Sequence, residues 1–225
     1  MIRCALVLTS LLLAGCLFRT EEGQPRKPIR PFAVGNSWVY VDSGYYGGDS
    51  IRIDSTRIDV LGSRELVIGG DTRTAYLLNT WNRAAGTPGP LTTFVQDRPD
   101  GEHTLGAMRD TATFLFETLH VKHPAKRGER YITYFPDLRL EGDTWIPVLD
   151  TVEIEVGVRD TVCVMPAGTF TCNQYFGRRG GVLFARTWYA PGVGYLGADT
   201  WRMLEVNGEQ RLVTFHKRLA YYVLR

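Results

Sequence analysis

The feature that most constrains the fold of this chain is a succession of short runs rich in β-branched and aromatic residues. Glycine, asparagine, aspartate or proline separates the runs, and apolar positions at helical spacing are scarce. The runs predict strands at Ser37–Val41, Ile51–Asp54, Thr74–Trp81, Leu91–Gln96, Thr113–Val121, Arg130–Phe135, Thr151–Val158, Thr161–Met165, Thr169–Phe176, Val182–Tyr189, Gly194–Glu205 and Arg211–Val223. The pattern therefore predicts a mostly β protein with little helix.

Many strands without the spacing of a β–α–β unit predict one antiparallel curved sheet. Such a sheet forms a barrel, a half-barrel or a two-sheet sandwich, and the residue pattern leaves these arrangements open. Hydrophobic residues make up 44% of the chain, which is enough for the core of a single β-rich domain over residues 32–225. The formal net charge of +2 gives no indication of a nucleic-acid partner.

The N-terminus has the layout of an export signal. A short basic start, Met1–Arg3, precedes an apolar stretch, Cys4–Ala14, which is too short to span a bilayer as a permanent helix. The stretch ends in Leu13-Ala14-Gly15-Cys16, which resembles the lipobox of bacterial lipoproteins. The resemblance implies a signal peptide over residues 1–15, and a Cys16 that is acylated and anchors the protein to a membrane of the cell envelope.

Residues 16–31 then predict a lipidated N-terminus followed by a flexible tether. Pro25, Pro28 and Pro31 lie among charged and small residues, a composition that keeps the chain extended. Leu17 follows the cysteine, where many lipoproteins retained at the inner membrane of Gram-negative bacteria carry an aspartate. The resemblance therefore favours the periplasmic face of the outer membrane.

A second resemblance spans most of the mature chain. The segments Pro31–Tyr40, Met165–Cys172 and Trp188–Gly194 are similar to recurring blocks of a broad group of uncharacterised β-rich bacterial envelope lipoproteins. No activity follows from this resemblance. It implies an envelope location and a β architecture.

Cys163 and Cys172 are the cysteines that remain beyond the signal and the lipid site, and an oxidising compartment favours a disulfide between them. If Ala167–Gly168 forms a two-residue loop, the two cysteines lie opposite each other and the bond is feasible. If Pro166–Gly168 forms a three-residue loop, which suits proline and glycine better, Cys163 lies opposite Thr171. That second register gathers one face from Val162, Val164, Phe170 and Cys172. The sequence leaves the disulfide open.

No residue pattern predicts a catalytic site, a metal site or a cofactor. His120 and His123, with His103 and Asp100 nearby, do not match the spacing of metal ligands and are interpreted as solvated loop residues. The chain lacks the Gly-x-Ser-x-Gly motif of a nucleophilic serine. The alternation around Glu153 and Glu155 favours a solvated strand face over acid–base chemistry.

Trp188–Gly194 is the most pocket-like segment of the chain. Pro191, Gly192 and Gly194 place a bend directly after Trp188 and Tyr189, between two aromatic-rich strands. The same residues are equally consistent with a turn that only stabilises the fold.

These observations support two functional hypotheses. The first is a non-enzymatic envelope lipoprotein whose curved sheet binds a hydrophobic ligand or lipid. The alternative is a structural or assembly lipoprotein that holds an envelope protein partner through a sheet edge or loops. A hydrolase with dispersed catalytic residues is the least favoured reading.

Overall fold

A computed structural model describes residues 26–47, 49–82, 90–110, 112–141, 144–206 and 208–225. The predicted signal peptide, Cys16 and the first part of the predicted tether lie outside these residues. The described chain contains strands and turns but no helix, so it has no helix long and apolar enough to cross a membrane. The strands are β1 (Ser37–Tyr46), β2 (Asp49–Ile68), β3 (Asp71–Asn82), β4 (Leu91–Arg98), β5 (Gly101–Arg109), β6 (Ala112–Lys122), β7 (Arg130–Glu141), β8 (Thr144–Val156), β9 (Thr161–Met165), β10 (Gly168–Arg179), β11 (Val182–Ala190), β12 (Gly194–Val206) and β13 (Glu209–Val223).

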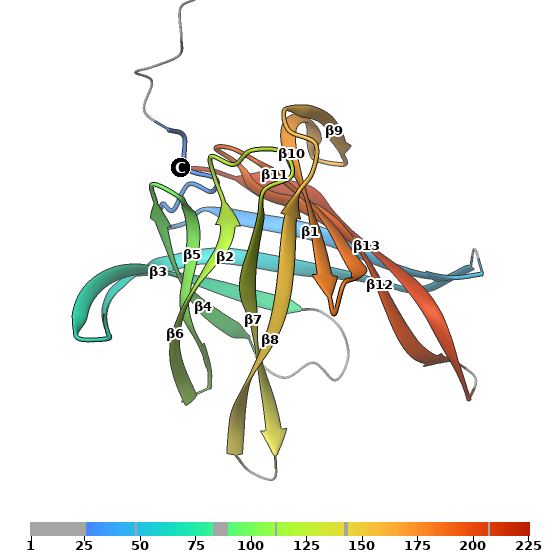
Figure 1. Ribbon diagram of the computed structural model, residues 1–225, viewed down its shortest axis with the longest axis horizontal. Coiled ribbons are helices and arrows are strands. Elements are labelled where there is room, and N and C mark those ends of the chain that lie inside the picture. Colours follow the sequence, from blue (N-terminus) through green and yellow to red (C-terminus); the bar gives the residue numbers. More distant parts are fainter. Residues whose placement is uncertain (1–25, 48, 83–89, 111, 142–143, 207) are drawn as a thin grey trace, which may run out of the picture.

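The strands form one antiparallel sheet that curls into a nearly closed barrel (Figure 1). Its order is β6-β5-β4-β3-β2-β1-β13-β12-β11-β10-β8-β7, with β9 paired to β10 alone. The end strands β6 and β7 meet through side chains: Thr118 Oγ1 lies 3.2 Å from Thr133 Oγ1 and accepts a hydrogen bond from the Tyr134 backbone N–H at 3.1 Å. The predicted mostly β, antiparallel fold is confirmed, and among the three predicted arrangements the barrel is the one observed.

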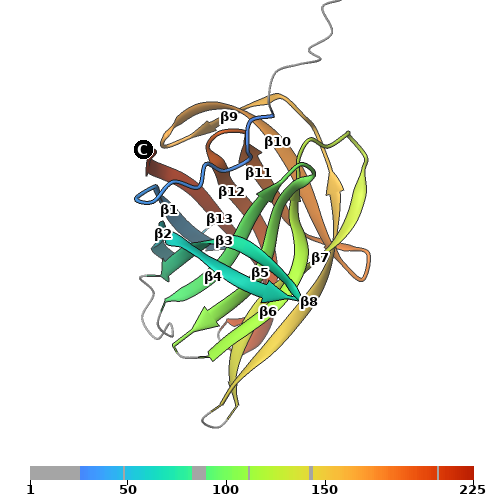
Figure 2. The ribbon, with the colours of Figure 1, turned by 90° about the vertical axis from the view of Figure 1, so that its left-hand side faces the viewer.

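The outer wall of the barrel carries a second layer, because β2 and β3 extend well beyond their neighbours. Figure 2 shows this hairpin crossing over β4 and β5. Leu66 and Ala75 on the hairpin pack against Phe94 and Leu105 beneath it, and all four side chains are buried. The sequence pattern ended the second strand before Gly62, whereas β2 passes through Gly62 with a bulge and continues to Ile68.

Strand β5 was not predicted, because its sequence GEHTLGAMR has few β-branched residues. Its residues are nevertheless mostly buried, since one face lines the barrel interior and the other lies under the β2–β3 hairpin. Gly101 lies so close to β6 that an added Cβ would clash with the Val121 carbonyl oxygen. Tertiary packing, rather than strand propensity, holds this segment in the sheet.

Residues 26–36, here called the N-terminal strap, cover one end of the barrel, where the C-terminus also lies (Figures 1 and 2). The Ile29 side chain is fully buried in the core. An Arg26 Nη2 N–H donates to the Arg98 carbonyl at 2.5 Å, and the Gly192 N–H donates to the Pro28 carbonyl at 2.8 Å. The last six residues of the predicted tether, 26–31, are thus packed against the barrel.

The β9–β10 hairpin covers the same end and carries a disulfide between Cys163 and Cys172, whose Cα atoms are 6.2 Å apart. Both registers considered from the sequence are wrong: Met165 pairs with Gly168, and Cys163 pairs with Phe170. The loop is Pro166–Ala167, so the cysteines are diagonal neighbours on one buried face, and the face predicted from Val162 and Val164 points to solvent. The hairpin packs against the end of the barrel, where the Ala167 N–H donates a hydrogen bond to the Leu219 carbonyl oxygen at 3.1 Å. This packing favours the observed register.

Candidate functional site

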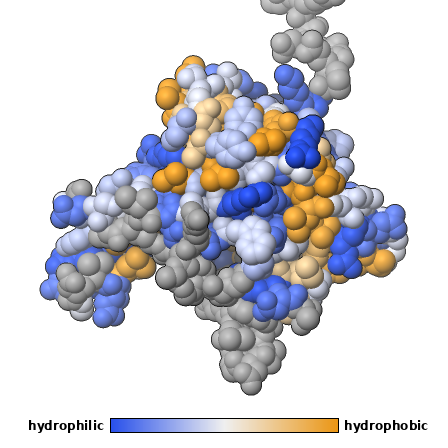
Figure 3. Space-filling view, turned by 180° about the vertical axis from the view of Figure 1, so that it is seen from behind, coloured by the Kyte–Doolittle hydropathy of each residue, from blue (hydrophilic) through white to orange (hydrophobic). Residues whose placement is uncertain are grey.

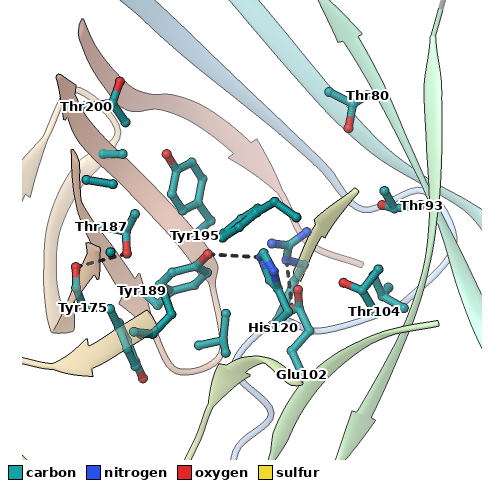
Figure 4. Close-up of a pocket in the computed structure, with 18 of the residues that line it drawn as sticks. Thr80, Thr93, Glu102, Thr104, His120, Tyr175, Thr187, Tyr189, Tyr195 and Thr200 are labelled. Carbon is teal, nitrogen blue, oxygen red and sulfur yellow. Dashed lines mark hydrogen bonds and ion pairs between the residues drawn. The ribbon is translucent and has the colours of Figure 1, made fainter. Parts of the chain in front are cut away.

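The barrel contains a cavity of about 450 Å³ that is partly open to solvent (Figure 4), and Arg30 of the N-terminal strap contributes to its wall. Its wall is mostly apolar and aromatic, with a few polar groups. The residues that line it are Arg30, Ile58, Leu78, Thr80, Leu91, Thr93, Val95, Glu102, Thr104, His120, Val121, Tyr131, Phe135, Ile154, Tyr175, Gly177, Arg179, Phe184, Ala185, Thr187, Tyr189, Tyr195, Ala198, Thr200 and Arg202. This space is the strongest candidate for a functional site among the described residues.

Strand alternation explains how so many strands contribute to one wall. Alternate side chains of a strand point to the same face, and in a barrel one face is the interior. Ala198, Thr200 and Arg202 of β12 enter the cavity at this spacing, and Leu91, Thr93 and Val95 of β4 do the same from the other side. The apolar positions of the predicted strands therefore line the cavity as well as filling the core.

A buried ion pair lies at the strap end of the cavity. Arg30 Nε is 3.4 Å from Glu102 Oε2, and the two side chains are 7% and 1% exposed. The Arg30 guanidinium also lies over the Trp38 ring, with Cζ 5.5 Å from the ring centroid. Burial alone would lower the pKa of Arg30, but the nearby Glu102 carboxylate holds that pKa above its ordinary value, so Arg30 stays charged.

His120 and Tyr189 lie beside this pair and point toward each other (Figure 4). His120 Nε2 is 3.4 Å from the Tyr189 hydroxyl oxygen, and the imidazole packs edge-on against Phe135. Burial lowers the pKa of His120, with Glu102 opposing and Arg30 reinforcing this effect, so the ring is neutral at pH 7. Burial also raises the pKa of Tyr189 well above its ordinary value, which keeps its hydroxyl protonated.

The lowered pKa of His120 predicts that acid destabilises the protein. The unfolded chain takes up the proton first as the pH falls through the ordinary histidine value of 6.5, so stability present above that pH is lost below it. We expect His120→Phe to show a smaller loss of unfolding free energy between pH 7.5 and pH 5.5 than the unsubstituted protein, the difference being at most about 1.4 kcal/mol per pH unit. Urea denaturation at the two pH values measures it. An imidazole that titrates by NMR at or above the ordinary value would contradict the prediction.

Of the five residues in the predicted pocket segment, Tyr189 lines the cavity. Trp188 faces the outer side of β11, where the Arg218 guanidinium lies over its ring. Pro191 and Gly192 form the turn that holds the strap. Gly194 has φ +105° and leaves room for the Arg30 side chain, because an added Cβ would lie 3.0 Å from Arg30 Cγ. The segment therefore supports the strap end of the cavity, and one of its side chains enters it.

No sequence pattern predicted Arg30, Glu102 or His120 as site residues. Arg30 lies in the predicted tether, Glu102 lies in the strand that was not predicted, and His120 was interpreted as a solvated loop residue. That interpretation is wrong, because His120 lies on β6 and lines the cavity, and His103 is buried on β5 with its Nε2 3.0 Å from Asp100 Oδ1. No local signal in the sequence distinguishes Glu102, because Asp97, Arg98 and Asp100 lie close to it.

The surface of the described residues shows weaker evidence for a functional site than the cavity does. Within the described residues, no group of three or more histidine, cysteine, aspartate or glutamate side chains is placed to hold a metal ion. Figure 3, which views the molecule from behind, shows exposed apolar side chains in patches broken by hydrophilic ones. Several of the most exposed apolar residues are distributed over three strands: Val67 on β2, Val162 and Val164 on β9, and Val182 on β11.

Comparison with known proteins gives similarity to two solved structures. One is a candidate lipoprotein from Parabacteroides distasonis ATCC 8503, with a TM-score of 0.46 and 13% identity over 89% of this chain and 100% of that chain. The other is a candidate exported protein with a YmcC-like fold from Bacteroides fragilis NCTC 9343, with a TM-score of 0.41 and 12% identity over 88% of this chain and 100% of that chain. No protein-family model and no curated protein matches the chain.

Proposed function

We propose that this protein is a lipid-anchored protein of the bacterial cell envelope that binds a hydrophobic ligand or lipid inside its barrel. The observation that carries the proposal is the cavity of about 450 Å³ within the barrel, which is partly open to solvent. Side chains do not fill this space, so the apolar groups that line it lack the contacts that they would make in a packed core. An evolved ligand site explains why the barrel leaves this space.

The character of the wall supports a ligand of largely apolar chemistry. Ligand pockets typically measure about 300–1,000 Å³, and apolar and aromatic side chains line them with a few polar groups that set orientation. Here aliphatic residues such as Ile58, Leu78 and Val95 line one part of the wall, and aromatic residues such as Phe135 and Tyr195 line another. Threonines such as Thr80, Thr93 and Thr200 are spread over the wall (Figure 4), whereas the buried Arg30–Glu102 pair lies at the strap end. The arrangement favours a binding role over a catalytic one.

The lipobox supports the anchor. Acylation of Cys16 would add more than one chain, and each buried methylene contributes about 0.8 kcal/mol, so the attachment would be effectively permanent. Leu17 favours the periplasmic face of the outer membrane for the anchored barrel. A binding site held at a membrane surface is suited to a lipid carrier or sensor.

Native mass spectrometry tests the acylation of Cys16 and the binding of a ligand in one experiment. The protein is extracted gently from its own membranes and compared with a Cys16→Ala form recovered from the soluble fraction. We expect a mass increment of acyl chains on Cys16 in the first sample. We also expect, in both samples, a further mass that dissociates on activation.

Two other outcomes would count against the proposal. One is an acyl increment on the unsubstituted protein together with an empty barrel in both samples. This result would contradict ligand binding and favour a lipoprotein that holds a protein partner. A protein without an acyl increment would contradict the anchor.

A further inference from the structure

We propose that the ligand is an amphiphile with a neutral, hydrogen-bond-donating headgroup, a hydroxyl or an amide, that enters the barrel head-first and binds Glu102. This inference rests on the proposed function and specifies the ligand class. It follows from the difference between the two ends of the cavity and from the incomplete bonding of the Glu102 carboxylate.

The cavity has a polar end that is buried and a second end marked by exposed arginines. The strap and the β9–β10 hairpin cover the barrel end near Arg30 and Glu102, which are almost fully buried. Arg179 is the last residue of β10 and Arg202 lies toward the far end of β12; both line the cavity and are exposed to solvent. A polar headgroup at the buried end makes hydrogen bonds without competition from bulk water, and these give the stronger selectivity.

Glu102 can accept a further hydrogen bond. Its Oε2 atom is buried and accepts no hydrogen bond from the described residues, because the 3.4 Å contact with Arg30 Nε lacks hydrogen-bond geometry. A buried carboxylate with an unsatisfied lone pair is costly unless a donor reaches it. A small rotation of the Glu102 side chain, which lines the cavity, would bring this atom within reach of a ligand O–H or N–H that completes its bonding.

The pair that binds the headgroup also restricts its charge. The Arg30–Glu102 pair is neutral as a unit, so a carboxylate, phosphate or ammonium headgroup would lose its hydration and add an unpaired charge to a buried site. A neutral donor gains the hydrogen bond without this desolvation cost. His120, which is neutral at pH 7, adds no charge to this end.

Aliphatic side chains and threonines form much of the remaining wall, which suits an alkyl chain. Leu78, Val95 and Ala198 are among the aliphatic residues, and Thr80, Thr93 and Thr200 are among the threonines. At the exposed end, Arg179 already pairs with Asp150 and lies over the Phe184 ring. Solvated arginines bind an anionic headgroup weakly, so they do not reverse the head-first orientation.

Isothermal titration calorimetry with three probes of equal chain length tests this selectivity. The probes are monododecanoylglycerol, dodecanoate and dodecylammonium, each below its micellar concentration, added to the full chain carrying Cys16→Ala. We expect monododecanoylglycerol to bind about tenfold more tightly than either charged probe. This ranking is measured with Arg30 and Glu102 both present, so it does not depend on a substitution in the cavity.

A charge-neutralising variant then tests the role of Glu102. Glu102→Gln leaves Arg30 without its counter-ion, so we expect the affinity for dodecanoate to rise about tenfold relative to monododecanoylglycerol. Glu155→Gln is the matched control, since Glu155 pairs with Arg130 at 2.9 Å outside the cavity. We expect this control to keep the original ranking, and thermal melting verifies that both variants are folded.

The outcomes separate this inference from the function on which it rests. If no probe binds to the folded protein, the proposed function fails. If a charged probe binds most tightly, or if folded Glu102→Gln keeps the original ranking, binding stands and the headgroup assignment is overturned. The expected ranking together with its shift in Glu102→Gln supports both.

Discussion

Arg30→Met should lower the free energy of unfolding by about 3–5 kcal/mol, because it removes the counter-ion of a buried carboxylate. Glu102 is 1% exposed, and Arg30 Nε, at 3.4 Å, is the cationic atom paired with it among the described residues. Methionine retains much of the aliphatic stem of Arg30, so the loss reports the charge more than the packing. Urea denaturation at pH 7.5, followed by tryptophan fluorescence, measures the change.

Two further variants identify the source of this effect. The double substitution Arg30→Met with Glu102→Leu removes both charges and should recover most of the lost stability. Arg57→Met is the surface control: Arg57 pairs with Asp59 at 2.9 Å but its side chain is 61% exposed, so its loss should cost less than about 1 kcal/mol. A double variant as unstable as Arg30→Met would contradict the assignment of the loss to an uncompensated carboxylate.

Trp38→Ala should also cost about 3–5 kcal/mol of unfolding free energy, because it empties a large site in the closed end of the barrel. The Trp38 side chain is fully buried and packs in one cluster with Leu196 and Leu219. Its Nε1–H donates a hydrogen bond to the Val193 carbonyl oxygen at 2.7 Å, which joins β1 to the turn that holds the strap. Thermal and urea denaturation of the variant check the loss.

A second tryptophan serves as the control for this measurement. Trp81 on β3 is 48% exposed, so Trp81→Ala should change the unfolding free energy by much less than Trp38→Ala. Trp38→Phe should fall between the two, since it keeps a ring in the site and loses the hydrogen bond. Equal losses in the two alanine variants would show that burial of Trp38 does not stabilise the barrel as we infer.

The strand pattern of the sequence predicted most of the sheet because burial on one face leaves a local mark. Segments such as Val182 to Tyr189 and Leu91 to Gln96 alternate or concentrate apolar residues as strands do, and they form β11 and β4. The prediction failed at β5, where both faces are covered by other parts of the chain. A strand buried by distant segments need not show the local alternation on which the prediction depends.

The candidate site was largely hidden for the same reason. Tyr189 was predicted as a pocket residue, since an aromatic residue before a proline–glycine bend is a local signal. Arg30 and Glu102 are 72 positions apart in the sequence, and no local pattern near either residue predicts that they form a pair. Their contact depends on the strap folding back over the barrel, which is a property of the assembled fold.

The sequence alone determined that this chain forms an antiparallel β fold, because the period of a strand and the residues of its turns are local properties. The resemblance to a lipobox could also be seen in the sequence alone, because the residues of an export signal are consecutive. Only the tertiary structure decided the β9–β10 register, the packing of residues 26–31 and the pairing of Arg30 with Glu102. These features depend on burial against distant segments, and the free energy of such burial exists only once the barrel has closed around its interior.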